Sequence, residues 1–87
     1  MPTIVIPSLM RDLTDGERRV SVSGRTVAQA IDALEALYPG AKARLCDGDH
    51  LDHTVAVSVD GKIARLGLRA PVKAESEIRF LPVIEGG

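Results

Sequence analysis

Alternating apolar and polar positions predict two short strands at the start of the chain. The apolar run over residues 3–6 predicts a first strand, which Pro7 ends because proline has no N–H to donate to a sheet. Residues 18–23 alternate, with Val20 and Val22 on one face, and predict a half-buried strand. We expect these strands to pair as a hairpin, joined by a polar loop.

A helix with one apolar face is predicted next. Thr26 is expected to cap its N-terminus, with Gln29 at capping-box spacing, and Pro39-Gly40 ends it. Apolar residues recur three and four positions apart and form one stripe; they are Val27, Ala30, Ile31, Leu34, Leu37 and Tyr38. A helix with a single apolar stripe needs a sheet to lie on.

The second half of the chain predicts a second hairpin. Residues 41–45 are expected to form one more short helical turn before a polar stretch. Residues 54–59 alternate, with the valines facing inward, and Asp60-Gly61 is a favoured two-residue hairpin turn. The strand that returns from this turn is expected over residues 62–66.

The last strand is predicted over residues 77–81. Ile78 and Phe80 share the face toward the core, which leaves Arg79 and Leu81 on the other face. We expect Pro82 to end the pairing.

The order of elements defines the predicted fold class. Strand, strand, helix, strand, strand, strand gives an α+β domain in which one main helix covers a mixed sheet of about five strands. This order suits a β-grasp fold. Residues 1–81 are expected to form the domain and residues 82–87 a flexible C-terminal tail.

Composition and charge exclude several classes of function. The chain has 87 residues, a net charge of −1, one Phe, one Tyr and no Trp, so nucleic-acid binding is not expected. No apolar run approaches the ~20 residues of a membrane span, and the first residues do not resemble a signal peptide. The single cysteine excludes an internal disulfide. We therefore expect a cytoplasmic protein.

Two groups of residues were candidates for chemistry of their own. His50 and His53 stand among three aspartates at 47, 49 and 52, but this loose set falls short of a zinc site and indicates a solvated loop. Cys46 lacks a recognisable activating partner, so a semi-buried structural thiol is the better interpretation. With no other catalytic grouping in the sequence, we expect that this chain is not an enzyme and binds neither a metal nor a cofactor.

The terminal residues LPVIEGG form the remaining candidate. Six residues beyond Leu81 could reach about 20 Å from the body, and the last two have no side chain. Such a tail could pass through a narrow channel and present its carboxylate to an ATP site. From the residues alone, a frayed end is an equally good interpretation.

The chain resembles the ubiquitin-like sulfur carriers of the MoaD/ThiS type. The segment IRFLPVIEGG, the hairpin VSVDGKIARL and the helix TVAQAIDALEALYPG occur in the order of that family, and the resemblance covers nearly the whole chain. The early segment IPSLMRDLTDGERRVSVSG is most like the cysteine-biosynthesis (CysO-type) branch of the family.

The resemblance implies a function for the tail. An E1-like enzyme would adenylate the carboxylate of Gly87, and sulfur would then displace AMP to leave a thiocarboxylate. Gly86 would keep the approach narrow, while Glu85 stands where the family commonly has a small residue, which bears on the choice of activating enzyme. Leu81 matches a position where the family carries an interface hydrophobe, and Pro82, Val83 and Ile84 would extend that interface.

The resemblance also implies the partners. They are an E1-like enzyme that uses ATP, a sulfur-accepting synthase, with pyridoxal phosphate if cysteine is the product, and a metalloprotease that frees the product. The small subunit of molybdopterin synthase and a carrier for a secondary metabolite are alternatives of the same chemistry. A ubiquitin-like protein modifier and a non-catalytic interaction module are alternatives of another class.

Overall fold

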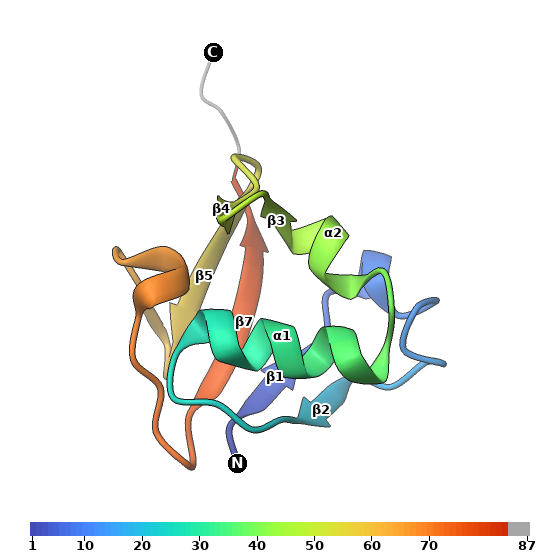
Figure 1. Ribbon diagram of the computed structural model, residues 1–87, viewed down its shortest axis with the longest axis horizontal. Helices are drawn as coiled ribbons and strands as arrows, with labels where there is room; N and C mark the ends of the chain where they lie inside the picture. The colour runs from blue at the N-terminus through green and yellow to red at the C-terminus, as the bar shows by residue number, and fades with distance from the viewer. Residues whose placement is uncertain (84–87) are drawn as a thin grey trace.

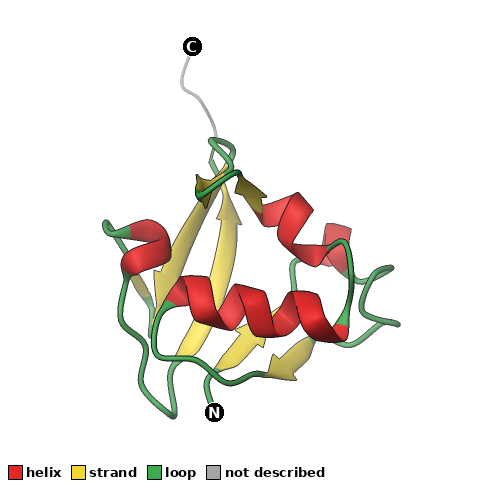
Figure 2. Ribbon diagram, in the orientation of Figure 1, coloured by secondary structure: helices red, strands yellow, loops and turns green. Residues whose placement is uncertain are grey.

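A five-stranded mixed sheet and one helix across its face make up the two layers of the protein (Figure 1, Figure 2). The computed structural model describes residues 1–83. In spatial order the strands of the sheet are β2 (Arg19–Ser21), β1 (Thr3–Val5), β7 (Glu77–Pro82), β5 (Val55–Val59) and β6 (Lys62–Ile63). The α+β, β-grasp prediction is confirmed.

The last strand of the chain, β7, lies at the centre of the sheet. It runs parallel to β1 and antiparallel to β5, so it joins the first hairpin to the second. Ile78 lies opposite Ile4, and both are fully buried. Phe80 lies opposite Val57, and both belong to the core as well. The predicted inward face of the last strand is therefore confirmed.

Helix α1 (Val27–Leu37) covers one face of the sheet (Figure 1). The Thr26 hydroxyl accepts a hydrogen bond from the Gln29 N–H (3.2 Å), as predicted, but the Gln29 side chain accepts from the Arg25 N–H (2.8 Å) and not from the cap residue. Leu37, which the stripe predicted to face the core, is 58% exposed. It lies in the last position of the helix and at the edge of the apolar stripe, about 80° from its centre at 100° per residue.

A carboxylate connects α1 to the short helix α2 (Ala41–Leu45). Glu35 accepts hydrogen bonds from the N–H groups of Lys42 (2.8 Å) and Gly40 (3.1 Å). These bonds, the one from Lys42 first, lower the pKa of Glu35. Gly40 has a left-handed backbone (φ 102°), which glycine adopts without strain. The Glu35 carboxylate and the left-handed backbone of Gly40 therefore fix the turn between the helices together.

Three short elements lie in segments that the sequence predicted to be irregular. They are the 3₁₀-helices η1 (Ser8–Met10) and η2 (Gly67–Arg69) and a small hairpin of β3 (Cys46–Asp47) with β4 (His50–Leu51). In the supposed polar loop, Met10 and Thr14 are buried, and the Thr14 hydroxyl donates to the Glu17 carbonyl at 2.9 Å. This segment is therefore a packed part of the domain.

The predicted hairpin turn at Asp60-Gly61 is present, with positive φ at both residues (52° and 84°). The Asp60 carboxylate accepts from the Glu77 N–H and the Ser76 hydroxyl, both at 2.9 Å. These bonds, that from Glu77 first, lower the pKa of Asp60. The second hairpin is thereby fastened to the start of β7. The returning strand β6 has two residues and not the predicted five.

The prediction that Pro82 ends the pairing is wrong. Pro82 lies in β7 opposite Val55, and the Val83 N–H donates to the Thr54 carbonyl at 2.8 Å. Strand β1 pairs with β7 only as far as Arg79. The backbone N–H groups of successive β7 residues point alternately toward β5 and toward β1. The position of the missing N–H of Pro82 points toward β1, which has already ended there, so no hydrogen bond of the sheet is lost.

Among residues 1–83, no helix is both long enough and apolar enough to cross a membrane.

We expect Leu34 and Leu37 to differ sharply although they lie on one helix. Leu34 is fully buried, so Leu34→Ala should lower the free energy of unfolding by about 2–5 kcal/mol, whereas Leu37→Ala should change it by less than about 0.5 kcal/mol. Urea unfolding followed by circular dichroism measures both. Equal losses for the two variants would contradict the packing described here.

Candidate functional site

The C-terminal end of β7 presents an exposed apolar surface. Leu81 lies opposite Ala56 on the sheet face away from α1 and is 39% exposed, while Phe80 points into the core. Pro82 and Val83 are exposed beside it. The predicted outward position of Leu81 is therefore confirmed. The other predicted site residues, Ile84, Glu85, Gly86 and Gly87, lie outside the described residues.

A groove of about 420 Å³ opens beside this strand end, between η1 and β5. Leu9 of η1 stands at its rim and is 85% exposed. Its other lining residues come from η1, α2, β5 and β7; they include Pro7, Met10, Leu45, Val55, Phe80, Leu81, Pro82 and Val83. The strand end and Leu9 thus form one largely apolar surface.

Arg44 of α2 holds η1 in place at this groove. Its Nη1 donates to the Leu9 carbonyl at 3.1 Å, and its Nη2 lies 3.6 Å from an Asp12 carboxylate oxygen. Met10, the residue after Leu9, is buried in the core. The backbone of the exposed Leu9 is therefore held in place by the hydrogen bond from Arg44 and by the burial of the next side chain, Met10.

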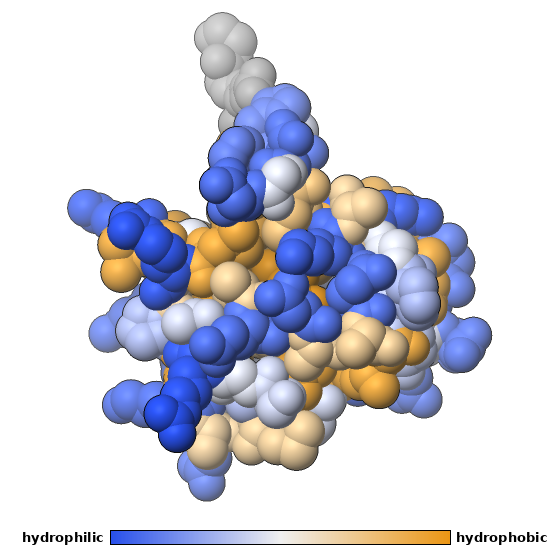
Figure 3. Space-filling model, in the orientation of Figure 1, coloured by the Kyte–Doolittle hydropathy of each residue, from blue (hydrophilic) through white to orange (hydrophobic). Residues whose placement is uncertain are grey.

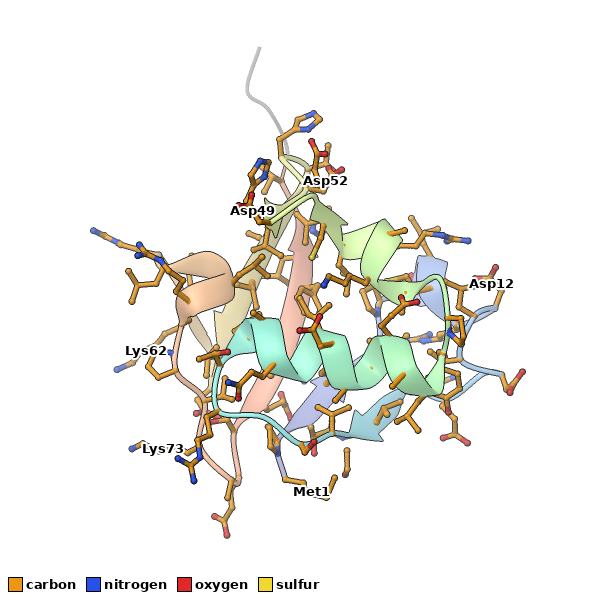
Figure 4. All side chains as sticks on the ribbon, viewed as in Figure 1. Met1, Asp12, Asp49, Asp52, Lys62 and Lys73 are labelled. Atoms are coloured by element: carbon orange, nitrogen blue, oxygen red, sulfur yellow. The ribbon has the colours of Figure 1, made fainter. Side chains whose placement is uncertain are left out.

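The β3–β4 hairpin leads into Thr54, whose carbonyl accepts a hydrogen bond from the Val83 N–H beyond the end of β7. Figure 4 labels Asp49 of this segment and Asp52, which follows β4. The Asp52 carboxylate accepts from the Thr54 hydroxyl (2.6 Å) and N–H (3.0 Å), which lowers the pKa of Asp52. Within residues 1–83, no group of three or more His, Cys, Asp or Glu side chains could hold a metal ion. The Asp52 carboxylate therefore stabilises the local structure of this loop.

Cys46 is half-buried between α2 and the β3–β4 hairpin. Burial raises the pKa of its thiol, and the nearby Lys42 opposes that shift only in part. Because the thiolate is the nucleophilic form, the thiol is poorly suited to attack at neutral pH. The interpretation of Cys46 as a structural thiol agrees with this environment.

Sequence reasoning did not find the contribution of η1 and α2 to the surface. Leu9 stands in a segment that reads as a polar loop, and Arg44 is 35 positions away along the chain. The signal in the sequence that could have indicated this contribution was Leu9, a large aliphatic residue next to Met10. Leu9 belongs to no periodic pattern.

The described architecture defines a class of protein, the ubiquitin-like β-grasp domains, with a central last strand that ends at an exposed apolar surface. The family model for the ThiS family matches residues 4–87. This chain belongs to the ThiS family.

Individual relatives agree with this assignment. The sulfur carrier protein CysO of Mycobacterium tuberculosis is 33% identical over 90 residues, covering 98% of this chain and 97% of CysO. A chain in the crystal structure of the Amycolatopsis orientalis BexX/CysO complex is 36% identical, with a TM-score of 0.91 and complete coverage of both chains. The crystal structure of SAMP1 from Haloferax volcanii is 28% identical, with a TM-score of 0.73 over 99% of this chain and 98% of SAMP1.

We expect Cys46 to react slowly with a thiol reagent. Because burial raises the pKa of this thiol, its alkylation by iodoacetamide at pH 7 should be several-fold slower than that of free cysteine. Time-resolved intact mass measures the rate, with urea-unfolded protein as the control. Faster reaction in the folded than in the unfolded protein would reveal an activated cysteine and contradict the structural interpretation.

Proposed function

We propose that this protein is a sulfur carrier whose reactive group is the α-carboxylate of Gly87. The observation that carries the proposal is the match to the ThiS family through residue 87, on a domain whose central strand ends at an exposed apolar surface. The 33% identity to a sulfur carrier protein over nearly the whole chain supports it further.

The proposed chemistry takes place in two steps on a partner enzyme. A carboxylate oxygen of Gly87 attacks the α-phosphorus of ATP, and pyrophosphate leaves, so an acyl-adenylate forms. Hydrosulfide then attacks the acyl carbon, the bond to the AMP oxygen breaks and AMP leaves, and loss of the proton on sulfur gives the thiocarboxylate. The first step is needed because a free carboxylate is a poor electrophile. We assign every catalytic residue to the E1-like partner, which also binds the ATP.

The proposed role of the domain is to hold the start of the C-terminal tail at a defined position for the partner enzyme. Hydrogen bonding holds β7 to β5 as far as Val83, the residue before Ile84. Leu81, Pro82 and Val83, with Ile84 after them, would contact the partner as the tail enters it. Gly86 would let the tail pass a narrow channel, and Glu85 would distinguish activating enzymes that accept a charge there.

We propose cysteine synthesis as the pathway, because the similarity to CysO extends over the whole domain. A pyridoxal-phosphate synthase would accept the sulfur, and a metalloprotease would release cysteine from the carrier. Molybdopterin synthesis and a secondary-metabolite pathway use the same activation step and differ only in the accepting enzyme.

The similarity to SAMP1 favours a second candidate function, a protein modifier. Solved proteins of that name are called small archaeal modifier proteins. In this case the same adenylate would end as an isopeptide bond on a lysine of a target protein. Cells would then contain conjugates of higher mass that disappear when Gly87 is removed.

We expect deletion of Gly87 to abolish activation without affecting the fold. The deletion moves the terminal carboxylate by one residue, about 3.5 Å, which should lower the rate of adenylation by at least about 100-fold. ATP–pyrophosphate exchange with the cognate E1-like enzyme measures this step. Gly87→Ala keeps the length of the tail and should retain more activity than the deletion. Full activity of the deletion variant would contradict the proposal.

We expect Leu81 to act in binding and not in chemistry. Leu81→Ala should raise the KM for the carrier in the exchange assay several-fold, with little change in kcat, because it removes an apolar contact made on docking. Leu37→Ala, an equal truncation of an exposed leucine on α1, is the matched control and should leave KM unchanged. Equal KM values for both variants would argue against a contact at Leu81.

A further inference from the structure

Charge is unevenly distributed over the described surface. Residues 61–76 contain four basic residues and one acidic residue, Glu75, although the whole chain has a net charge of −1. By contrast, residues 46–54, which include the β3–β4 hairpin, contain three aspartates and no lysine or arginine. Lys62 and Lys73 project from one side of the molecule, away from Asp49 and Asp52 in the segment of the β3–β4 hairpin (Figure 4).

The four cations of this segment are exposed and available to a partner; they are Lys62, Arg65, Arg69 and Lys73. The ion pairs found among residues 1–83 involve Arg19, Lys42, Arg44, His53 and Arg79, and none involves these four. We call them, together with Ile63 and Leu66, the basic edge.

Two large aliphatic side chains stand among the cations. Ile63 is 59% exposed and Leu66 56% exposed. Figure 3 shows strongly hydrophobic and strongly hydrophilic side chains next to one another along this side of the molecule, at the left. Apolar side chains within a charged rim are the composition of a protein interface.

One side chain of the basic edge, Ile63, lies on the same face of the sheet as Leu81. Ile63 lies opposite Ser58, and Ala56, two residues before Ser58 on β5, lies opposite Leu81. Opposite residues of an antiparallel pair share a face, and so do residues two apart, so Ile63 and Leu81 both lie on the face away from α1. Lys62, the residue before Ile63, lies opposite Val59 and therefore on the α1 side of the same edge strand.

The distance across this face fits a single interface. β6 lies two strands from β7, which is about 10 Å at the usual strand spacing. A standard interface buries about 800 Å² on each partner, equivalent to a disc of about 16 Å radius. One partner can therefore cover Leu81 and Ile63 together and reach the cations next to Ile63 at the edge of the sheet.

We propose that the basic edge docks on an acidic, partly apolar surface of the E1-like activating enzyme, next to the channel that receives the tail. The inference rests on the proposed function, and that enzyme is the partner that every pathway considered above requires. Complementary charge on the two proteins speeds their encounter and orients the carrier before the tail enters.

A nucleic acid is the less favourable partner for the basic edge. Stacking on bases needs exposed aromatic rings, but Phe80 is buried and Tyr38 follows α1, away from this segment. The exposed side chains of Ile63 and Leu66 can form neither ion pairs nor hydrogen bonds with a phosphate backbone. The charge, together with these side chains, fits a protein.

The test is a charge reversal at the basic edge in ATP–pyrophosphate exchange with the cognate E1-like enzyme. Lys62→Glu and Arg65→Glu should each raise the KM for the carrier about three-fold or more, and the double variant about ten-fold, with kcat unchanged. Arg18→Glu makes the same change of charge at the opposite edge of the sheet and should have little effect. Circular dichroism melting verifies that each variant is folded.

Salt provides an independent readout. Between about 50 and 300 mM NaCl, kcat/KM of the unmodified carrier should fall, and that of the double variant should change far less. If Lys62→Glu and Arg18→Glu raise KM equally, or if salt affects all variants alike, the inference is overturned. Binding of a fluorescent DNA oligomer that the reversals abolish while KM stays constant would also overturn it.

Absence of exchange with the unmodified carrier and a demonstrably active enzyme would refute the proposed function itself. Exchange that ignores the charge reversals would refute only the docking surface. The two failures are therefore distinguishable.

Discussion

The pairing of β7 with both β1 and β5 is the constraint on which the rest of the structure depends. Without it, the first hairpin and the second would be separate, and neither could bury its apolar face. Ile78 stands at the centre of this arrangement, fully buried and opposite both Ile4 and Val59. Because β7 is the last strand of the chain, the same contacts that complete the core also fix the direction in which the C-terminal segment begins. The Val83 N–H, bonded to Thr54, is the end of that ladder.

As a consequence, the two faces of the sheet differ in their exposure to solvent. α1 covers one face and seals the core, whereas Leu81 and Ile63 are exposed on the other face, where we propose that a partner docks. Short connections add to the exposed surface, since η1 presents Leu9 and Arg44 fixes it. The domain therefore needs no catalytic residue of its own to be useful to an enzyme: a stable body, an exposed docking surface and a tail of fixed origin are sufficient for the proposed role.

The sequence predicted the structure best in elements where the spacing of apolar residues follows the period of one strand or one helix. Alternation placed Ile78 and Phe80 inside and Leu81 outside, and the spacing of Val27, Ile31 and Leu34 gave the buried stripe of α1. Prediction failed where tertiary contacts decide. Pro82 stays in β7 because β1 ends earlier, which no local pattern reveals.

The same limit applies to the candidate surface. η1 is stabilised by the burial of Met10 and by an arginine 35 positions away, so a local reading of that segment gave a loop. The four basic residues between positions 62 and 73 are plain in the sequence, but the placement of Ile63 on the same face as Leu81 depends on the register of β5 with β6 and β7.

The intact mass of the protein after incubation with ATP, a sulfide source and its cognate E1-like enzyme tests the central claim most directly. The account predicts a gain equal to the replacement of one oxygen by sulfur, located on the C-terminal peptide by fragmentation. An unchanged mass, with an enzyme shown to form the adenylate of this protein, would contradict the claim that the protein carries sulfur and would favour the transfer of its C-terminus to lysines of other proteins.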